Sequence, residues 1–562
     1  MATSEKAARA AATHDGPAAA AALPGTAAPA EAAPSRPGGA ADRRWTPRLD
    51  GAVLSRLAAR AAVADGGATF PLVTPLTGAE CARVPEGTPG DIAAAAAASR
   101  EAQSRWAATP FAERGRVLLR FHDLVLSRRD EILDIIQLET GKARRHAFEE
   151  VMDVAIWSRF YAHTAESFLR PRRRQGVLPL LTAAWELHHP RGVIGFVTPW
   201  NYPLNMSLSD AVPALMAGNG AVIKPDSQTP FTCLWAAELL ERAGLPHGLV
   251  QVVPGRGSLL GEPLIAAADY LMFTGSTATG RTVAGHSAAQ LKDCSMELGG
   301  KNPLLVLPDA DLPRAVAGAA RGIIGNGGQQ CVHPERIYVP GRLYERFCEA
   351  LVATLRRVKL GASFTYADDM GSLAGKAQLD RVTRHVEDAV AKGARVLTGG
   401  RPRPDVGPYF YEPTLLAGVD ETMVACRDET FGPVAAVYPC SSVDDMVRRA
   451  NDSEYGLNAS VWTRDTRLGR AVAARLQAGT VNVNEAYAAA FVSAGPQGGF
   501  KQSGLGRRHA RQGIVKYTEA QTVAVERLLA LDTPPFLTHA QYAAVMPAVL
   551  RLLRQVPGYD RG

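Results

Sequence analysis

Hydrophobic and polar positions along the chain predict a long helical region followed by two regions of alternating strands and helices. Residues 90–169 carry apolar residues at three- and four-residue spacing, with few Gly or Pro, which predicts helices. Short apolar, β-rich runs then alternate with helical stretches, a rhythm typical of parallel sheets covered by helices. The clearest predicted strands are 192–198, 220–223, 249–253, 270–273, 304–307, 336–339 and 434–437.

The two ends of the chain differ from its middle. Residues 1–45 are dominated by Ala, Pro and Gly and predict a disordered tail, because they cannot bury enough surface to offset the entropy of ordering. Residues 515–527 contain enough β-branched residues for a strand. The extension 528–562 contains an amphipathic helix over 542–553, and we expect its apolar face to dock on the body of the protein or on a partner subunit rather than on a membrane.

Composition narrows the class of protein. The chain has 562 residues, 46% hydrophobic and 21% charged, with a net charge of +7. This excludes wholesale disorder and a small secreted scaffold, and the densest basic run, 170–174, reads as a solvated edge rather than a nucleic-acid site. The seven scattered Cys predict reduced thiols and a cytoplasmic location. No run approaches the ~18–20 apolar residues of a membrane span, and we predict neither a signal peptide nor a metal site.

Three residues are candidates for catalysis. Cys331 follows a run of small and polar residues that leaves room for a substrate, although most Cys are inert core residues. Glu297 lies among apolar residues before two glycines, so burial could raise its pKa into the range of a general base, and a salt-bridged structural Glu fits equally well. Asn201 follows a predicted strand, where α/β proteins bind ligands, and its amide could stabilise an oxyanion or simply favour a turn.

Further residues are candidates for binding a nucleotide. Lys224 closes a predicted strand and could contact a sugar or phosphate. The segment 273–282 is one residue away from a Walker A loop, but Arg281 replaces its Lys, which argues against an NTPase. Backbone amides at the start of a helix there could still hold a pyrophosphate, although no GxGxxG fingerprint follows a predicted strand. Glu429 and Phe431 could hold a ribose and flank a nicotinamide ring, or form a capped turn.

Seven motifs, in this order, resemble the aldehyde dehydrogenase superfamily over residues 70–527. They are PWNYP (199–203), KPDSQTP (224–230), FTGSTATG (273–280), MELGGKNP (296–303), GQQC (328–331), ETFGP (429–433) and GGFKQSGLGR (498–507). The resemblance implies an α/β fold with a parallel-sheet dinucleotide-binding domain, a parallel-sheet catalytic domain and a small bridging sheet that makes a homodimer or homotetramer. The corresponding ranges are 46–169 with 190–299, then 300–508, then 170–189 with 509–527.

The resemblance also implies a mechanism. Cys331 attacks an aldehyde as a thiolate, and the Asn201 amide and the Cys331 backbone N–H stabilise the oxyanion of the thiohemiacetal. Hydride passes to a nicotinamide positioned by Glu429 and Phe431, leaving a thioester. Glu297 then activates the water that releases the carboxylate.

The resemblance places the dinucleotide beside residues that end or follow the predicted strands. They are Thr198, Pro199, Trp200, Lys224, Ser227, Gly275 and Ser276. Ser227 stands where NAD-preferring members carry a Glu that would repel a 2′-phosphate. We therefore predict NADP as the cofactor, with NAD as the alternative.

The substrate is the least constrained expectation. The pattern is most similar to actinobacterial succinic semialdehyde dehydrogenases of the second type, yet the two Arg that hold the carboxylate in better-known succinic semialdehyde enzymes align with Ser209 and Gly325. Asp210 and Arg508 likewise replace a Lys and a Glu of a proposed proton relay. Succinic semialdehyde is the predicted substrate. The alternatives are larger apolar or aromatic aldehydes, suggested by Tyr202 and Met206, or a non-catalytic binding relative.

Overall fold

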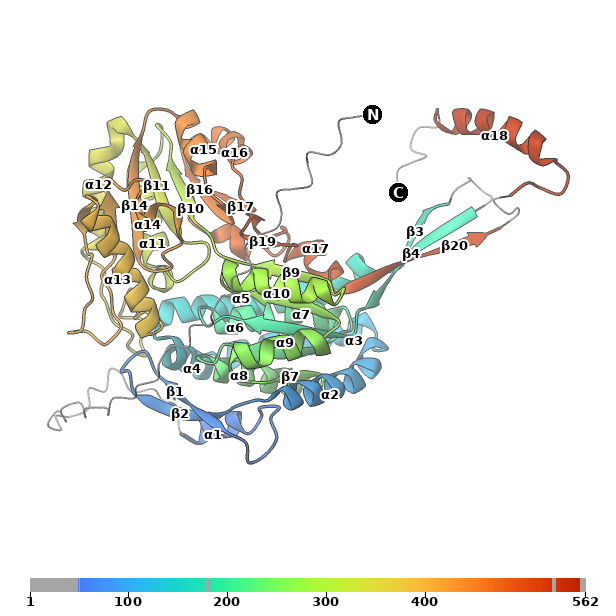
Figure 1. Ribbon diagram of the computed structural model, residues 1–562, viewed down its shortest axis with the longest axis horizontal. Coiled ribbons are helices and arrows are strands. Elements are labelled where there is room, and N and C mark those ends of the chain that lie inside the picture. Colours follow the sequence, from blue (N-terminus) through green and yellow to red (C-terminus); the bar gives the residue numbers. More distant parts are fainter. Residues whose placement is uncertain (1–48, 50, 177–181, 528–531, 556–562) are drawn as a thin grey trace, which may run out of the picture. The chain divides into compact units, whose positions relative to one another are not determined.

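A computed structural model describes residues 49, 51–176, 182–527 and 532–555 (Figure 1). The predicted tail, 1–45, lies outside the described residues, as do parts of the predicted C-terminal extension. The described residues contain sheets of six, seven and three strands and two short two-stranded ribbons. Helices connect the parallel strands of the two large sheets, so the predicted α/β class is confirmed.

The six-stranded sheet has the order β19-β9-β8-β5-β6-β7, and its strands from β5 to β9 are parallel. Its central strands are buried apolar runs, as expected where helices cover both faces. The predicted strands at 192–198, 220–223, 249–253 and 270–273 are confirmed. The strands are β5 (Val193–Thr198), β6 (Gly220–Pro225), β7 (Val250–Val252), β8 (Tyr270–Thr274), β9 (Cys294–Glu297) and β19 (Gly504–Leu505). The helices are α6 (Pro203–Leu208), α7 (Ala211–Met216), α8 (Pro230–Arg242), α9 (Gly257–Ala267) and α10 (Thr277–Ala289).

The predicted helical region packs against this sheet as four helices. The first of the four, α2, starts with a capping box, in which the side chains of Thr88 and Asp91 each accept a hydrogen bond from the other residue's backbone N–H. Trp157, Phe121 and Trp235 are fully buried between these helices and α8. The N-terminal elements are α1 (Gly51–Ala58), β1 (Thr69–Val73), β2 (Glu80–Pro85), α2 (Pro89–Ala107), α3 (Phe111–Ser127), α4 (Arg129–Thr140) and α5 (Arg144–Leu169).

The seven-stranded sheet has the order β12-β13-β14-β11-β10-β16-β17, and only the β12–β13 pair is antiparallel. Leu304 and Leu305 point into separate hydrophobic cores on its two faces. The strands are β10 (Asn302–Val306), β11 (Pro334–Pro340), β12 (Arg395–Thr398), β13 (Thr414–Ala417), β14 (Val434–Cys440), β16 (Asn458–Trp462) and β17 (Thr480–Val483). The helices are α11 (Leu312–Ile324), η2 (Gly325–Gly328), α12 (Gly341–Leu355), α13 (Lys376–Ala391), α14 (Val424–Arg427), α15 (Val443–Asn451), α16 (Thr466–Ala473) and η3 (Ala488–Phe491).

The third sheet joins β3 (Arg172–Gln175), β4 (Thr182–Pro190) and β20 (Thr518–Glu526) in antiparallel pairs. The strand predicted at 515–527 starts only at Thr518, because α17 (Ala510–Val515) precedes it. The predicted C-terminal helix is α18 (His539–Leu553), whose Val545, Leu550 and Leu552 are at least half exposed, so the docking of its apolar face stays a prediction. The remaining ribbon pairs β15 (Tyr455–Gly456) with β18 (Phe500–Lys501). Among the helices of the described ranges, none has the length and apolar character to span a membrane.

The chain itself joins the edges of the two large sheets. β9 ends at Glu297 and β10 begins at Asn302, so the segment 298–301 links the carboxyl edge of the first sheet to the amino edge of the second. β19 returns from much later in the sequence and pairs with β9, with Gly504 opposite Glu297. Ligands of α/β proteins bind outside the carboxyl ends of strands, which makes this junction the expected binding site.

Candidate active site

A cavity of about 250 Å³ lies at the junction of the two large sheets. Residues that end or follow β5, β8 and β9 line it together with residues that precede β11 and β14. Nine predicted site residues line it: Pro199, Trp200, Asn201, Gly275, Ser276, Glu297, Cys331, Glu429 and Phe431. The other three, Thr198, Lys224 and Ser227, lie at the end of β5 and at or just after the end of β6.

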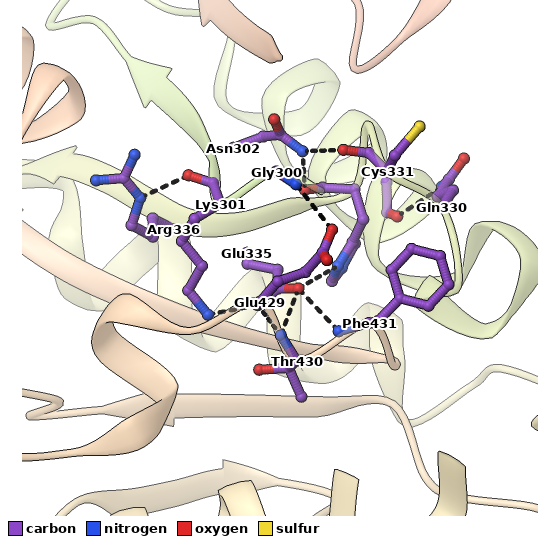
Figure 2. Close-up of polar contacts among 12 residues, drawn as sticks. Gly300, Lys301, Asn302, Gln330, Cys331, Glu335, Arg336, Glu429, Thr430 and Phe431 are labelled. Atoms are coloured by element: carbon purple, nitrogen blue, oxygen red, sulfur yellow. Dashed lines mark hydrogen bonds and ion pairs between the residues drawn. The ribbon is translucent and has the colours of Figure 1, made fainter. Parts of the chain in front are cut away.

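Cys331 lies between η2 and β11 on a tightly folded segment (Figure 2). Asn326, five residues before it, adopts a left-handed backbone with φ of 49°. The side-chain amide of Asn302 donates to the carbonyls of Cys331 (2.7 Å) and His333 (2.9 Å), which ties the segment to β10. Burial raises the pKa of the Cys331 thiol to about 12, and the charges of Glu297 and Glu429 add to the rise. The thiol therefore needs a neighbouring base to become a nucleophile.

A buried ion pair holds Asn201 in place after β5. Lys142 Nζ donates to the Asn201 carbonyl (2.6 Å) and pairs with the Glu150 carboxylate (2.6 Å). Glu150 also accepts hydrogen bonds from two backbone N–H groups at the start of α6. The Asn201 amide donates to the carbonyl of Gln329, two residues before Cys331 (3.1 Å). Because an amide carries two N–H bonds, the other can reach an oxygen inside the cavity.

Glu297 is a buried carboxyl group with a pKa near neutrality. It is the last residue of β9 and is 5% exposed. Burial raises the pKa of Glu297 to about 7, against the opposing effect of the charges of Arg508 and Lys516. A carboxyl group that is half ionised at neutral pH can both accept and return a proton, as a general base must.

Glu429 and Phe431 are fixed by a second buried network (Figure 2). The Glu335 carboxylate accepts hydrogen bonds from the backbone N–H groups of Thr430 (2.9 Å) and Phe431 (3.0 Å). The backbone N–H of Gly300 donates to Glu429 Oε1 (2.8 Å). The Phe431 ring meets Trp200 edge-on, with ring centroids 5.6 Å apart. Phe431 itself has φ of 58°, a strained conformation of the kind that gathers at functional sites.

The cavity suits a dinucleotide at the side of α10. The N-terminus of this helix opens at Ser276, and the backbone N–H groups of such a first turn attract phosphate. A Cβ at Gly299 would lie 2.5 Å from Glu429 Oε2, so a side chain at this position would displace the Glu429 carboxyl group. Lys224 Nζ is buried at the end of β6 and donates to the Pro225 carbonyl (2.5 Å). A helix N-terminus, an aromatic pair and a buried amine at one sheet edge fit the phosphates, ring and sugar of a nicotinamide dinucleotide.

Sequence reasoning missed several polar residues that line the same cavity as Glu297. They are Asp153, Asn205, Gln497 and His509. Asp153 comes from α5, where the helical pattern predicts only a core position, and burial raises its pKa to about 8. A polar residue on an otherwise apolar helix face is the one signal that could have revealed it.

The two predicted departures at 210 and 508 contact each other. Arg508 Nε lies 2.6 Å from Asp210 Oδ2, so the positions form one buried ion pair. Arg508 also lines the cavity, whereas Asp210 lies behind it. The two departures from the expected pattern, at 210 and 508, are therefore one pair of opposite charges.

Comparison with known proteins identifies the family. Residues 62–523 match the model of the aldehyde dehydrogenase family. A protein of Mycolicibacterium smegmatis, provisionally named a succinate-semialdehyde dehydrogenase (NADP(+)), is 48% identical over 91% of this chain and 100% of its own length. A hydroxyisobutyraldehyde dehydrogenase of Mycolicibacterium austroafricanum is 37% identical over 82% of this chain and 91% of its own.

Solved structures agree with the sequence comparisons. An aldehyde dehydrogenase of Bacillus cereus, solved as an NAD+ complex, superposes with a TM-score of 0.81 at 36% identity, covering 85% of this chain and 99% of that one. The resemblance drawn from the seven motifs and the predicted aldehyde-dehydrogenase-like architecture are thereby confirmed. The chain belongs to the aldehyde dehydrogenase family.

Proposed function

We propose that the chain oxidises succinic semialdehyde to succinate with NADP, using Cys331, Glu297 and Asn201 as catalytic residues. The observation that carries this proposal is that a thiol, a carboxyl group with a pKa of about 7 and a fixed amide line one cavity. Each group has the chemistry that one step of aldehyde oxidation requires.

Glu297, Cys331 and Asn201 each serve particular steps of the proposed aldehyde oxidation. Glu297 takes the thiol proton, and Cys331 Sγ attacks the aldehyde carbon. The second N–H of the Asn201 amide and the backbone N–H of Cys331 stabilise the resulting oxyanion. When bound, the nicotinamide cofactor supplies the hydride acceptor that leaves the acyl group on sulfur as a thioester. Once that first proton has passed from Glu297 to solvent, Glu297 takes a proton from the water that attacks the thioester. The bond between the acyl carbon and sulfur then breaks, the carboxylate leaves, and the sulfur takes the proton from Glu297 to restore the thiol.

The cofactor would lie between α10 and Phe431. Glu429, Phe431 and Trp200 would hold the nicotinamide riboside, and the N-terminus of α10 at Gly275 and Ser276 the pyrophosphate. Thr198 and Pro199 would form the adjoining wall, and Lys224 and Ser227 would face the adenosine ribose. Ser227 carries no charge to repel a 2′-phosphate, and the provisional name of the M. smegmatis relative specifies NADP(+). NADP is the proposed cofactor, with NAD as the alternative that the NAD+ complex of the B. cereus relative supports.

A second substrate class has its own support. Tyr202, Met206 and Phe491 line the cavity, and an apolar or aromatic aldehyde would pack against them. The relative named for hydroxyisobutyraldehyde acts, by its name, on an aldehyde without a carboxylate. The name of the M. smegmatis relative favours succinic semialdehyde, which we keep as the first candidate.

The assembly and location of the chain belong to the same proposal. The six-stranded sheet with its helices would bind the dinucleotide, and the seven-stranded part would present Cys331. A homodimer or homotetramer would form through the sheet of β3, β4 and β20, because β20 is an exposed edge strand. All seven Cys are free thiols, which supports a reducing, cytoplasmic location.

The test measures turnover and thiol labelling on the same protein. Purified enzyme is assayed with succinic semialdehyde, butanal and benzaldehyde, each with NADP and with NAD, by the absorbance of the reduced cofactor. We expect the highest kcat/KM for succinic semialdehyde with NADP, and no turnover by Cys331→Ser. Cys81→Ser, which changes a half-buried thiol that does not line the cavity, is the matched control and should keep turnover. Iodoacetamide that labels other cysteines but leaves position 331 unmodified and turnover intact would contradict the proposed chemistry.

A further inference from the structure

Two buried cations share one carboxylate behind the cavity wall. Arg508 Nε lies 2.6 Å from one oxygen of Asp210, and Lys516 Nζ lies 2.8 Å from the other. The Tyr517 hydroxyl donates to that second oxygen (2.8 Å). Burial acts to raise the pKa of Asp210, but the charges of Arg508 and Lys516 outweigh it and hold the pKa well below its usual range. With Asp210 ionised, the three charged groups carry one net positive charge.

Arg508 is a buried residue that lines the cavity. The residue is only 3% exposed, yet it lines the cavity together with Glu297 and Met206. Nη2 donates to the Ser209 hydroxyl, and Nη1 lies 3.5 Å from Met206 Sδ, a weak acceptor. An anionic oxygen would be a much stronger partner for Nη1 than a thioether sulfur.

Asp210 balances one of the two buried cations, and the titratable groups that line the cavity add little negative charge to balance the other at neutral pH. Burial raises the pKa of Asp153 to about 8 and that of Glu297 to about 7, so the first is mainly protonated and the second half protonated. Burial lowers the pKa of His509 well below its usual value, which keeps it neutral. The other arginine among the described lining residues, Arg381, donates to the Glu429 carbonyl in the part of the cavity assigned to the cofactor. A buried cation of this kind favours an anionic ligand.

We propose that Arg508 is the specificity-determining residue that binds the distal carboxylate of an anionic aldehyde while the aldehyde carbon meets Cys331. This inference rests on the proposed function, because it concerns the same cavity and the same reaction. A semialdehyde of a dicarboxylic acid has the required chemistry, with an aldehyde at one end and a carboxylate at the other. Arg508 follows β19 in the chain and donates to the Ser209 hydroxyl. Ser209 and Gly325 stand where the better-known succinic semialdehyde enzymes carry Arg, and Arg508 would supply the missing guanidinium.

The test compares two aldehydes of equal chain length on the same enzyme preparation. Succinic semialdehyde and butanal are assayed with wild type, Arg508→Met and Arg508→Lys. In Arg508→Met we expect kcat/KM for succinic semialdehyde to fall by about 10- to 150-fold, as for the loss of a hydrogen bond to a charged group, mainly through KM. Butanal makes no such bond and should lose much less, although both aldehydes should share a small loss because the charge of Arg508 also acts on the pKa of Glu297. Arg508→Lys should restore part of the loss, and Arg511→Gln, a half-exposed arginine in α17, is the matched control.

The ratio of the two kcat/KM values is insensitive to the fraction of folded enzyme, so poor folding of a variant cannot imitate the result. Equal losses for both aldehydes, or no loss for either, would overturn the role of Arg508. Failure of the wild type to oxidise any aldehyde would instead refute the proposed function. As a readout without turnover, succinate should protect Cys331 of the wild type from iodoacetamide better than butyrate does. Loss of this difference in Arg508→Met supports the inference, and its persistence contradicts it.

Discussion

Cys331 and Glu297 line the same cavity, where burial raises both of their pKa values, to about 12 and about 7. At neutral pH the Cys331 thiol therefore stays protonated, whereas the Glu297 carboxyl group is half ionised. An exposed glutamate with a pKa near 4.3 would be a much weaker base. The environment of single side chains therefore assigns the proton-accepting role to Glu297.

A pH profile tests the role of Glu297. Because only the ionised form accepts a proton, kcat/KM of the wild type should rise with pH through an apparent pKa of about 7. Glu297→Gln should lower kcat by about 10²- to 10⁴-fold and remove this limb of the profile. Glu345→Gln, on the exposed face of α12, is the control and should leave the profile unchanged. An unchanged limb in Glu297→Gln would assign the titration to another group.

Asp210 is expected to stabilise the fold by compensating two buried cations. Asp210→Asn leaves Arg508 and Lys516 without their shared carboxylate and should lower the free energy of unfolding by about 3–5 kcal/mol. Asp452→Asn, which breaks an exposed pair with Arg427, should cost less than about 1 kcal/mol. Urea unfolding at pH 7 compares the two. Because the pKa of Asp210 is depressed in the folded state, its contribution is present above about pH 3.9 and is lost as the pH falls toward the folded value.

At the scale of elements, the loop before β11 and the loop before β14, both strands of the seven-stranded sheet, touch at Gly328. This residue has φ of +70°, and a Cβ there would lie 2.0 Å from the carbonyl oxygen of Gly432. The contact brings the segment that carries Cys331 against the segment that carries Phe431. Any side chain at 328 would force the two segments apart.

A matched pair of glycine substitutions separates this contact from backbone strain. Gly418 has nearly the same φ, +73°, with nothing within 4 Å of an added Cβ. Gly418→Ala should therefore cost only the left-handed strain, about 1–2 kcal/mol in free energy of unfolding. Gly328→Ala should cost more and should also lower kcat. Equal destabilisation of the two variants, with kcat preserved, would show that the loops do not depend on this approach.

The elements also show what sequence can and cannot reveal. The predicted strands of the two large sheets are confirmed as β5, β6, β7, β8, β10, β11 and β14, because each contains an apolar run bounded by turn residues. β9, β12, β13, β16, β17 and β19 were not predicted, since they are short and several of them carry polar residues. Cys331, Glu297 and Asn201 could be selected because each lies in a distinctive motif. Asp153 was not predictable, because its helix shows only a core pattern and the cavity exists only after α5 meets α6. The strand predicted at 515–527 was too long, because a high content of β-branched residues does not reveal that α17 ends at Val515 and that β20 starts only at Thr518. Pairing between distant charges, such as Asp210 with Arg508, needs the tertiary fold.

At the scale of the whole molecule, β20 leaves one long edge without a partner among the described strands. It pairs with β4 on one side only, and most of its residues are exposed. Such an edge is a template for pairing with another chain. We therefore expect the assembly of subunits to depend on this strand.

Introducing a charge on this edge tests the expectation. Val525 is 41% exposed, and Val525→Lys should shift the protein toward monomers in light scattering coupled to size-exclusion chromatography. Val73→Lys, at a valine that is 40% exposed in β1, is the control and should leave the mass unchanged. Equal masses for both variants and the wild type would place the subunit contact elsewhere.

The pairing of β19 with β9 has a consequence for how the enzyme becomes active during synthesis. A ribosome has completed Glu297 and Cys331 long before it adds Gly504 and Arg508, and domains fold from the N-terminus as they emerge. A nascent chain thus displays both reactive side chains while one wall of the pocket is still missing. A message truncated before codon 504 would yield a protein with an intact nucleophile and base but a cavity open to water, so we expect no turnover until residues 504–509 have been made and β19 has paired with β9.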